Sequence, residues 1–255
     1  MIEADDRGFL LGDGLFETVL WENGVFAAFD AHAVRLIVGC ATLGLPAPEQ
    51  ATLEAAAMTA IAREGLRETR AAVRLTWTAG SGGRGLDRPP EIAPRLATTA
   101  AAAPKPTTPA RLIVSAIRRN EGSPASRLKS LAYLDNVLAR REARAAGADE
   151  ALMLNNRGEI AGAAAANLFW FEGDTLVTPA LECGVLAGIT RAAVIERART
   201  IGWTVREDRA PVAALTGATG LFLTNSLIGV RPVSQFGDRN NKPHPRMTAL
   251  EIFPA

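Results

Sequence analysis

The composition changes near the middle of the chain, and this change limits how the 255 residues can be arranged. From Thr98 to Pro109 the sequence is rich in Ala, Pro and Thr, which is typical of a linker. The sequence on either side is long enough to bury a core of its own. We therefore predict a small N-terminal domain over residues 1–106, a linker and first strand over 107–118, and a larger C-terminal domain over 119–255.

The N-terminal half alternates between strand and helix patterns. A β-rich run on both sides of Asn23-Gly24 predicts a hairpin, because this dipeptide favours the tight turn between two strands. Helices are expected over 31–43, with Asp30 as N-cap, and over 53–64. A strand is expected over 71–78.

The C-terminal half has the same mixed character. Strands and helices in both halves indicate an α+β protein of two α/β domains. The expected elements are a strand over 111–116, a polar loop over 120–126, a helix from about Ser130 to Ala146, strands over 150–154, 166–171 and 176–178, a helix over 190–201 and a strand over 221–225.

Composition excludes several classes of function. The net charge of +1 indicates neither a nucleic acid nor an anionic membrane as partner. Two cysteines, Cys40 and Cys183, are too few for a disulfide framework and favour a reducing compartment. No apolar run reaches the roughly 18 residues of a membrane span, and the acidic start does not resemble a signal peptide. We expect a cytoplasmic protein without a bound metal.

One motif is misleading. Residues 80–85 read Gly-Ser-Gly-Gly-Arg-Gly and match the GxGxxG pattern of dinucleotide-binding turns. Such a turn must open a helix whose N-terminus holds the pyrophosphate, whereas Leu86-Asp87-Arg88-Pro89-Pro90 follows here. We interpret the segment as a flexible glycine loop, or as a loop that brings backbone amides and Arg84 to an anion.

Lys129 is the first candidate for chemistry. Only three lysines occur in the chain, and this one lies among Leu128, Leu131 and Leu134 where a loop enters a predicted helix. Most lysines are solvated surface residues. A desolvated lysine, however, has a lowered pKa and can form a Schiff base with a carbonyl compound.

Two further segments have features of a phosphate site. Gly188-Ile189-Thr190 opens a predicted helix, where free backbone N–H groups and a hydroxyl suit an anion, although Thr190 could equally be a plain cap. Thr224 and Asn225 follow a strand end, where an ordinary turn is the alternative. Together with Lys129 they predict a phosphate-bearing cofactor near a Schiff-base lysine.

The order of these motifs resembles the fold-type IV pyridoxal-phosphate enzymes, a family of branched-chain aminotransferases, D-amino acid aminotransferases and 4-amino-4-deoxychorismate lyases. The lyase and D-amino acid branches are the most similar. The resemblance spans nearly the whole chain and implies two α/β domains of the D-amino acid aminotransferase-like type with the cofactor between them. The segments that carry it are residues 6–9, 12–18, 32–36, 129–142, 167–169 and 188–191.

The resemblance also implies roles for single residues. Lys129 would hold pyridoxal 5'-phosphate and move the proton at the substrate carbon. His32 would pack near Arg35 and not act in catalysis. Tyr133 lies one residue short of the place where some relatives direct a tyrosine at the cofactor, so it is expected either there or in the core. The implied phosphate contacts are Arg35, Gly188, Ile189, Thr190 and Thr224 or Asn225.

The chain departs from the family at Gly162. Relatives have a glutamate five residues before the Asn of the motif Asn167-Leu168-Phe169, and its carboxylate keeps the cofactor's pyridine nitrogen protonated. Glu159 lies three residues away, and an odd offset in a strand directs it to the opposite face. We therefore expect a weaker electron sink, which disfavours transamination more than a reaction that ends in an aromatic product.

The glycine-arginine loop around Arg84 and the small residues before Asn167 are similar to the lyases. This favours release of pyruvate from aminodeoxychorismate to give 4-aminobenzoate, a step of folate biosynthesis, with Arg84 and Phe16 contacting the substrate. The alternatives are an aminotransferase for D-amino acids, branched-chain amino acids or amines, and a degenerate cofactor-binding protein with weak activity. The resemblance further implies a homodimer.

Overall fold

The computed structural model describes residues 2–250, and the chain divides into two compact units. Unit 1 comprises Met1–Pro104 and Leu128–Ala132, and unit 2 comprises Lys105–Arg127 and Tyr133–Ala255. The division at residue 104 is close to the expected end of the first domain at 106. The short segment Leu128–Ala132, which contains Lys129, belongs to unit 1 although it comes from the middle of the sequence.

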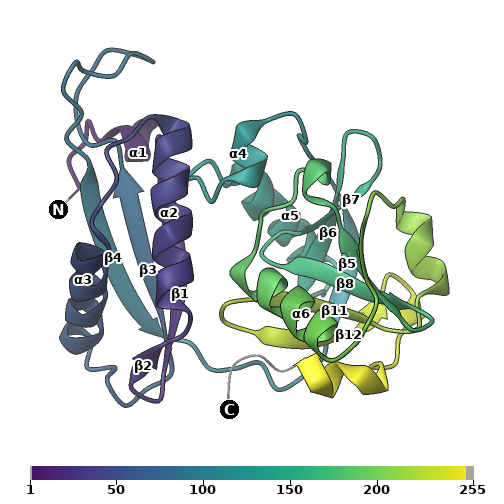
Figure 1. Ribbon diagram of the computed structural model, residues 1–255. Coiled ribbons are helices and arrows are strands. Elements are labelled where there is room, and N and C mark those ends of the chain that lie inside the picture. Colours follow the sequence, from purple (N-terminus) through teal and green to yellow (C-terminus); the bar gives the residue numbers. More distant parts are fainter. Residues whose placement is uncertain (1, 251–255) are drawn as a thin grey trace. The chain divides into compact units, whose positions relative to one another are not determined.

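Unit 1 is a four-stranded antiparallel sheet with two helices packed on one face (Figure 1). The strand order is β2-β1-β3-β4. Its core lies between the sheet and the helices, where Val19 and Val73 meet Leu36 and Ile61. The elements are α1 (Arg7–Leu11), β1 (Gly14–Glu22), β2 (Val25–Phe26), α2 (Phe29–Leu43), α3 (Gln50–Arg63), β3 (Ala71–Thr78) and β4 (Arg95–Ala102).

The hairpin at the start of unit 1 is confirmed. Trp21 pairs with Phe26 and Glu22 with Val25, which leaves Asn23 and Gly24 at the tip. Both tip residues have positive φ, 54° and 80°, as a type I′ turn requires. The strand over 71–78 is also confirmed and pairs with β1 along its whole length.

Three expectations for unit 1 were wrong. The stretch from Thr98 to Ala102 is not linker but the second half of β4, because its backbone pairs in register with β3. Helix α2 begins at Phe29 and is capped by Ala28, while the Asp30 carboxylate accepts a hydrogen bond from Gln50. Helix α3 begins at Gln50, before the expected start at Leu53.

Unit 2 is built on a nine-stranded mixed sheet. The strand order is β10-β9-β8-β11-β12-β5-β6-β7, and β13 pairs with β12. Ile160 of β7 and Trp170 of β8 pack in the same hydrophobic cluster, so the sheet curls around this core (Figure 1). The strands are β5 (Ala110–Arg119), β6 (Glu150–Asn155), β7 (Ile160–Ala163), β8 (Asn167–Glu172), β9 (Thr175–Pro179), β10 (Val205–Asp208), β11 (Leu221–Asn225), β12 (Gly229–Phe236) and β13 (Arg239–Asn240).

One helix of unit 2 lies within one residue of its predicted limits, and another begins later than predicted. Helix α6 (Ile189–Thr200) starts and ends one residue before the expected limits. Helix α5 (Leu134–Ala145) begins four residues later than expected, because Lys129–Leu131 pairs with the edge of β1. The short α4 (Pro124–Arg127) lies in the expected polar loop. Strands β7, β10, β12 and β13 were not predicted from the sequence.

Candidate active site

The lysine segment is joined to the start of β1 by an isolated antiparallel β-bridge between Leu15 and Ser130. Phe16 N–H donates to the Lys129 carbonyl at 2.8 Å, and Leu131 N–H donates to the Gly14 carbonyl at 3.0 Å. Gly14 permits this approach, since a Cβ there would lie 2.4 Å from the Trp77 carbonyl oxygen and 2.9 Å from the Leu131 side chain. The backbone of Lys129 is therefore fixed by β1 and not by helix α5.

The side chain of Lys129 lies over an aromatic ring. Its Nζ is 4.3 Å from the centroid of Phe16, and the Arg74 guanidinium carbon is 3.7 Å from the same centroid. A ring face attracts cations, so both groups are held over the Phe16 ring. The structure thus brings together Lys129 and Phe16, the expected catalytic and substrate-contacting residues of unit 1.

Arg35 is anchored by a buried carboxylate on the other face of β1. Arg35 Nε and a terminal nitrogen donate to the two oxygens of Glu17 at 2.7 and 2.6 Å. His32 Nδ1 contacts the same carboxylate at 2.7 Å. Burial would raise the pKa of Glu17, but hydrogen bonds from Arg35 and then His32 lower it below its usual range. Glu17 is therefore ionised and fixes the direction of the Arg35 guanidinium.

His32 has a positioning role. It is buried, and desolvation lowers its pKa more than the hydrogen bond to Glu17 raises it. A neutral imidazole beside an ionised carboxylate donates its Nδ1 proton. The expectation that His32 packs near Arg35 is confirmed.

The glycine loop after β3 is held in place by Arg7. Its terminal nitrogens donate to the carbonyls of Asp87 at 3.0 Å and Leu86 at 2.9 Å, and its Nε donates to Asp13 at 3.0 Å. Gly83 has φ +82°, and a Cβ there would lie 2.2 Å from the Asp87 carbonyl oxygen. The loop is thus a defined structure that opens no helix, in agreement with the rejection of a dinucleotide site.

Arg84 is exposed at the tip of this loop, where its backbone pairs with Asp87. Arg88 secures the base of the loop through two hydrogen bonds to Asp13 at 2.6 and 2.9 Å. The hydrogen bond from Arg88 lowers the pKa of Asp13, so the carboxylate remains ionised. Arg84 is therefore presented to solvent, as are its loop neighbours Leu86 and Asp87.

The start of helix α6 in unit 2 forms a cradle with β8. Gly188 is its N-cap, and a Cβ there would lie 2.0 Å from Asn167 Oδ1. Asn167 Nδ2 in turn donates to the Leu186 carbonyl at 3.0 Å. Only glycine allows the helix start to approach the strand this closely, and the N–H groups of Ile189 and Thr190 lie in the first turn.

Two buried hydroxyls mark the same region. Within residues 2–250, Thr190 Oγ1 and Thr224 Oγ1 are buried and have no hydrogen-bond partner. Thr224 pairs with Asn167 across the β11–β8 ladder, and Asn167 contacts Gly188. A buried hydroxyl without a partner is unfavourable, and a phosphate group would supply acceptors for both.

The side chain of Asn225, unlike that of Thr224, is engaged in hydrogen bonds. Its Nδ2 donates to the Ala165 carbonyl at 2.9 Å, and its Oδ1 accepts from the N–H groups of Leu227 and Ile228, both at 2.9 Å. The side-chain amide is therefore engaged in holding the β11–β12 turn. Of the two residues considered for this contact, Thr224 has the uncommitted group.

The turn after Gly162 contains only small side chains. Gly162 has φ +95°, a conformation that L residues rarely adopt, and Ala163 N–H donates to the Ala166 carbonyl at 2.8 Å. Asn136 Nδ2 donates to the Ala164 carbonyl at 2.7 Å and so ties the turn to α5. The position that the resemblance gives to a glutamate is thus a glycine in a glycine-specific conformation.

Glu159 does not replace the missing carboxylate. Its oxygens accept from Asn155 Nδ2 at 2.7 Å and from Arg209 at 2.8 and 3.0 Å. The hydrogen bond from Asn155 is the largest of the effects that lower its pKa. These contacts fix Glu159 next to β10, and the expectation that it serves another face is consistent with them.

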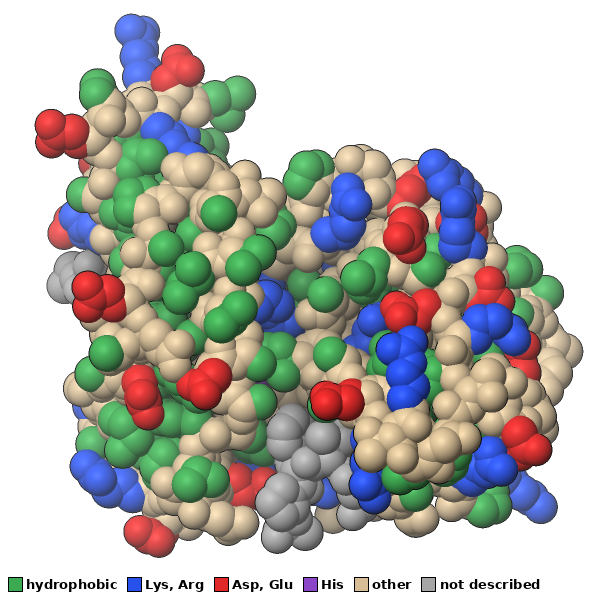
Figure 2. Space-filling model, in the orientation of Figure 1, with side chains coloured by type: hydrophobic (Ala, Val, Ile, Leu, Met, Phe, Trp, Pro, Cys, Tyr) green, Lys and Arg blue, Asp and Glu red, His purple; other side chains and the backbone are tan. Residues whose placement is uncertain are grey.

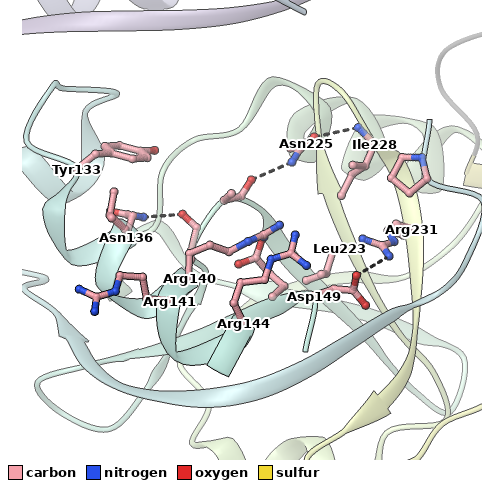
Figure 3. A pocket seen from close by; sticks show the side chains of 15 residues that line it. Tyr133, Asn136, Arg140, Arg141, Arg144, Asp149, Leu223, Asn225, Ile228 and Arg231 are labelled. Carbon is pink, nitrogen blue, oxygen red and sulfur yellow. Dashed lines mark hydrogen bonds and ion pairs between the residues drawn. The ribbon is translucent and has the colours of Figure 1, made fainter. Parts of the chain in front are cut away.

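Tyr133 is the N-cap residue of α5 and lines a pocket of unit 2 together with Asn225 (Figure 3). Sequence reasoning missed the contributions of Arg7, Asp13 and Asn136. Arg7 and Asp13 occur in segments already singled out, but nothing local indicates that they bind a loop more than 70 residues away.

Among residues 2–250, no group of three or more His, Cys, Asp or Glu side chains could hold a metal ion. Nor does the described part of the chain contain a helix long and apolar enough to cross a membrane.

Comparison with known proteins identifies relatives over most of the chain. The family model described as "Amino-transferase class IV" matches residues 14–236. A "Putative branched-chain-amino-acid aminotransferase" of Methanocaldococcus jannaschii is 33% identical over 253 residues, covering 94% of this chain and 85% of that protein. An aminodeoxychorismate lyase of Bacillus subtilis is 30% identical over 239 residues, covering 92% and 81%. The crystal structure of 4-amino-4-deoxychorismate lyase from Pseudomonas aeruginosa has a TM-score of 0.85 at 31% identity, covering 98% and 93%.

Proposed function

Because the chain belongs to the class IV aminotransferase family and is a pyridoxal-phosphate-dependent enzyme, we propose that it is a lyase that releases pyruvate from an amino-substituted chorismate and leaves 4-aminobenzoate. The observation that carries this proposal is the turn at Gly162. Its small side chains and the engagement of Glu159 elsewhere leave the cofactor's ring nitrogen without a carboxylate from this segment. Aromatisation of the product provides a driving force that transamination lacks.

The residues present fit the cofactor. When bound, pyridoxal phosphate supplies an electron sink for the bonds at the substrate's amino-bearing carbon. We propose that Lys129 Nζ holds it covalently. We further propose that the backbone at Gly188 and Ile189 and the hydroxyls of Thr190 and Thr224 receive its phosphate. The two buried hydroxyls without partners support this assignment most directly.

The remaining contacts are proposed from each unit separately. The Arg35 guanidinium, directed by Glu17, adds a positive charge for the phosphate. The Tyr133 hydroxyl is proposed to donate a hydrogen bond to the cofactor's phenolic oxygen. Asn225 is proposed to act indirectly, since its side chain holds the turn that follows Thr224.

Lys129 is also the proposed proton carrier. As an uncharged amine, Lys129 Nζ would be a base able to remove the proton from the substrate carbon. The Phe16 ring lies 4.3 Å from this Nζ and so helps to position it. Arg84, exposed on the loop that Arg7 holds, is proposed to bind a substrate carboxylate with its planar guanidinium.

A direct assay separates the lyase from its alternatives. Purified enzyme given aminodeoxychorismate should release pyruvate and 4-aminobenzoate in equal amounts. The 33% identity to the Methanocaldococcus relative supports an aminotransferase, which would instead aminate α-keto acids from a D-amino acid, a branched-chain amino acid or an amine. A degenerate cofactor-binding protein would be yellow and inactive in both assays. Amination without pyruvate release would overturn the lyase proposal.

A pair of variants tests the role of Gly162. Gly162→Ala introduces a side chain at φ +95° and measures strain alone, which costs roughly 1–3 kcal/mol. Gly162→Glu adds the carboxylate to the same strain. If the site works without that carboxylate, the glutamate variant should release pyruvate no faster than the alanine variant. A glutamate variant faster than the wild type would show that the proposal misjudges the site.

We also propose a homodimer, as the family resemblance implies. Three neighbouring side chains of α1, Phe9, Leu10 and Leu11, are 72%, 58% and 44% exposed, and Leu86 on the glycine loop is 85% exposed. Apolar side chains gathered in this way mark a protein contact more often than a solvated surface. Light scattering after size exclusion should give twice the mass of 26.9 kDa. A location in the cytoplasm stays a prediction.

A further inference from the structure

A pocket in unit 2 is lined by Tyr133 and Asn225 and, beyond them, by arginine side chains that have no part in the proposed reaction. It lies between helix α5 and the β11–β12 hairpin and has a volume of about 760 Å³ (Figure 3). Volumes of about 300–1,000 Å³ are typical of small-molecule sites. Tyr133 and Asn225 line it, so an occupant would lie beside two residues proposed to serve the cofactor.

The pocket concentrates arginine side chains. Arg140 and Arg144 extend from α5 into the same space, whereas Arg141 points away from it (Figure 3). Arg231 enters from β12. Four arginines and two acidic residues, Asp149 and Glu150, line the pocket, so positive charge prevails.

The two acidic residues are already used. Glu150 pairs with Arg140, and Asp149 pairs with Arg231 at 3.1 Å. Within residues 2–250, Arg144 makes no hydrogen bond or ion pair to a side chain that would hold its guanidinium. Neighbouring guanidinium groups repel each other, and an anion bound between Arg140 and Arg144 would relieve this repulsion.

The walls of the pocket are apolar. Val137 lines it from α5, Leu223 from β11 and Ile228 from the turn that precedes β12. Val137 is 52% exposed although it is an aliphatic residue on a helix rich in charge. A phosphate or sulfate ion would leave this surface uncovered. A carboxylate on an apolar body would use both parts, since guanidinium groups bind carboxylates in a bidentate manner.

We propose that this pocket binds a small organic carboxylate, with its carboxylate between Arg140 and Arg144 and its apolar body against Val137 and Ile228. The four residues proposed to bind it, Arg140, Arg144, Val137 and Ile228, all belong to unit 2. The proposal does not depend on which reaction the enzyme catalyses, so it can fail or succeed separately from the lyase assignment.

Calorimetric titration of the cofactor-saturated enzyme with benzoate tests the proposal. We expect saturable binding with a Kd of about 1 mM or tighter, which is reasonable for a ligand of this size. Arg144→Gln should weaken binding by about tenfold or more, because a charged hydrogen bond is lost. The matched control is Arg118→Gln, which removes an exposed arginine of unit 2 outside the pocket and should leave binding unchanged.

A second variant tests the apolar wall of the pocket independently of the arginines. Val137→Asp places a negative charge at an exposed position, where folding should be unaffected, and should also abolish benzoate binding. Inorganic phosphate should bind more weakly than benzoate if the apolar walls contribute. Absence of benzoate binding, equal affinity in Arg144→Gln and wild type, or tighter binding of phosphate would each overturn the proposal.

Discussion

Gly188→Ala is the substitution with the most defined structural consequence. The new Cβ would lie 2.0 Å from Asn167 Oδ1 and 3.1 Å from Asn167 Cγ, far inside contact distance. Either the Asn167 side chain rotates and loses its hydrogen bond to the Leu186 carbonyl, or the start of α6 moves away from β8. Both responses displace the N–H groups of Ile189 and Thr190, which are the proposed phosphate contacts.

The expected loss of stability is the sum of the close contact at the new Cβ and the lost hydrogen bond of Asn167. Overpacking of a close contact costs about 1–3 kcal/mol, and the lost hydrogen bond adds about 1 kcal/mol. We expect the free energy of unfolding to fall by about 2–4 kcal/mol in total. A shift of the helix start should raise the Kd for pyridoxal phosphate by about 10–100-fold, which corresponds to one or two lost charged hydrogen bonds.

The assay measures cofactor affinity by absorbance and unfolding by urea titration. Gly217→Ala is the matched control, because no atom lies within 4 Å of a Cβ added there. Asn167→Ala in the Gly188→Ala background removes the obstructing oxygen and should restore part of the affinity. If Gly188→Ala binds pyridoxal phosphate as tightly as the wild type and unfolds at the same urea concentration, the proposed cradle is wrong.

Three further predictions concern separate parts of the site. Thr190→Val removes a buried hydroxyl without a partner, so the cofactor-free protein should be as stable as the wild type or up to about 1 kcal/mol more stable. Its affinity for the cofactor should fall. A loss of stability together with the loss of affinity would contradict the assignment. Arg7→Met should destabilise the fold by about 3–5 kcal/mol, because it removes a buried guanidinium that donates to Asp13 and to two loop carbonyls. Arg84→Gln, by contrast, should raise KM for substrate without changing the melting temperature. Glu17 has a lowered pKa in the folded state, so its stabilising contribution is complete above the usual glutamate pKa of about 4.3 and is lost as the pH falls through the folded value. Urea titrations at pH 6 and pH 4 should therefore show a smaller acid loss in Glu17→Gln than in wild type, and an equal loss would refute this reasoning.

Local signals in the sequence were sufficient for several elements. The Asn23-Gly24 turn, the strand Ala71–Thr78 and the start of α6 follow from turn chemistry, alternation and helix caps, which act over a few residues. The motif order was also sufficient to indicate the family, and the family model confirms it.

Long-range pairing set the elements that the sequence did not reveal. The Lys129 segment resembles the first turn of a helix, but hydrogen bonds to Gly14 and Phe16, more than 110 residues away, hold it in a β-bridge to β1. The Ala- and Thr-rich segment to Ala102 resembles a linker until its pairing with β3 is known. The Arg7 contacts with the glycine loop depend on the same tertiary arrangement.

Gly162 shows a further limit of sequence reasoning. Counting back from Asn167 identified Gly162 as the position where relatives have a glutamate. The alternation of faces along a regular strand, however, does not describe the backbone at this position. The residue lies in a left-handed backbone conformation, so a glutamate there is opposed by the main chain as well as absent from the sequence.

The central claim is that Lys129 carries the cofactor. Borohydride reduction of the enzyme loaded with pyridoxal phosphate, followed by peptide mass spectrometry, tests it directly, because the chain has only three lysines, Lys105, Lys129 and Lys242. We expect a phosphopyridoxyl group on the peptide that contains Lys129, and loss of the label in Lys129→Ala. A label on Lys105 or Lys242, or no label on a protein that is saturated with the cofactor, would contradict it.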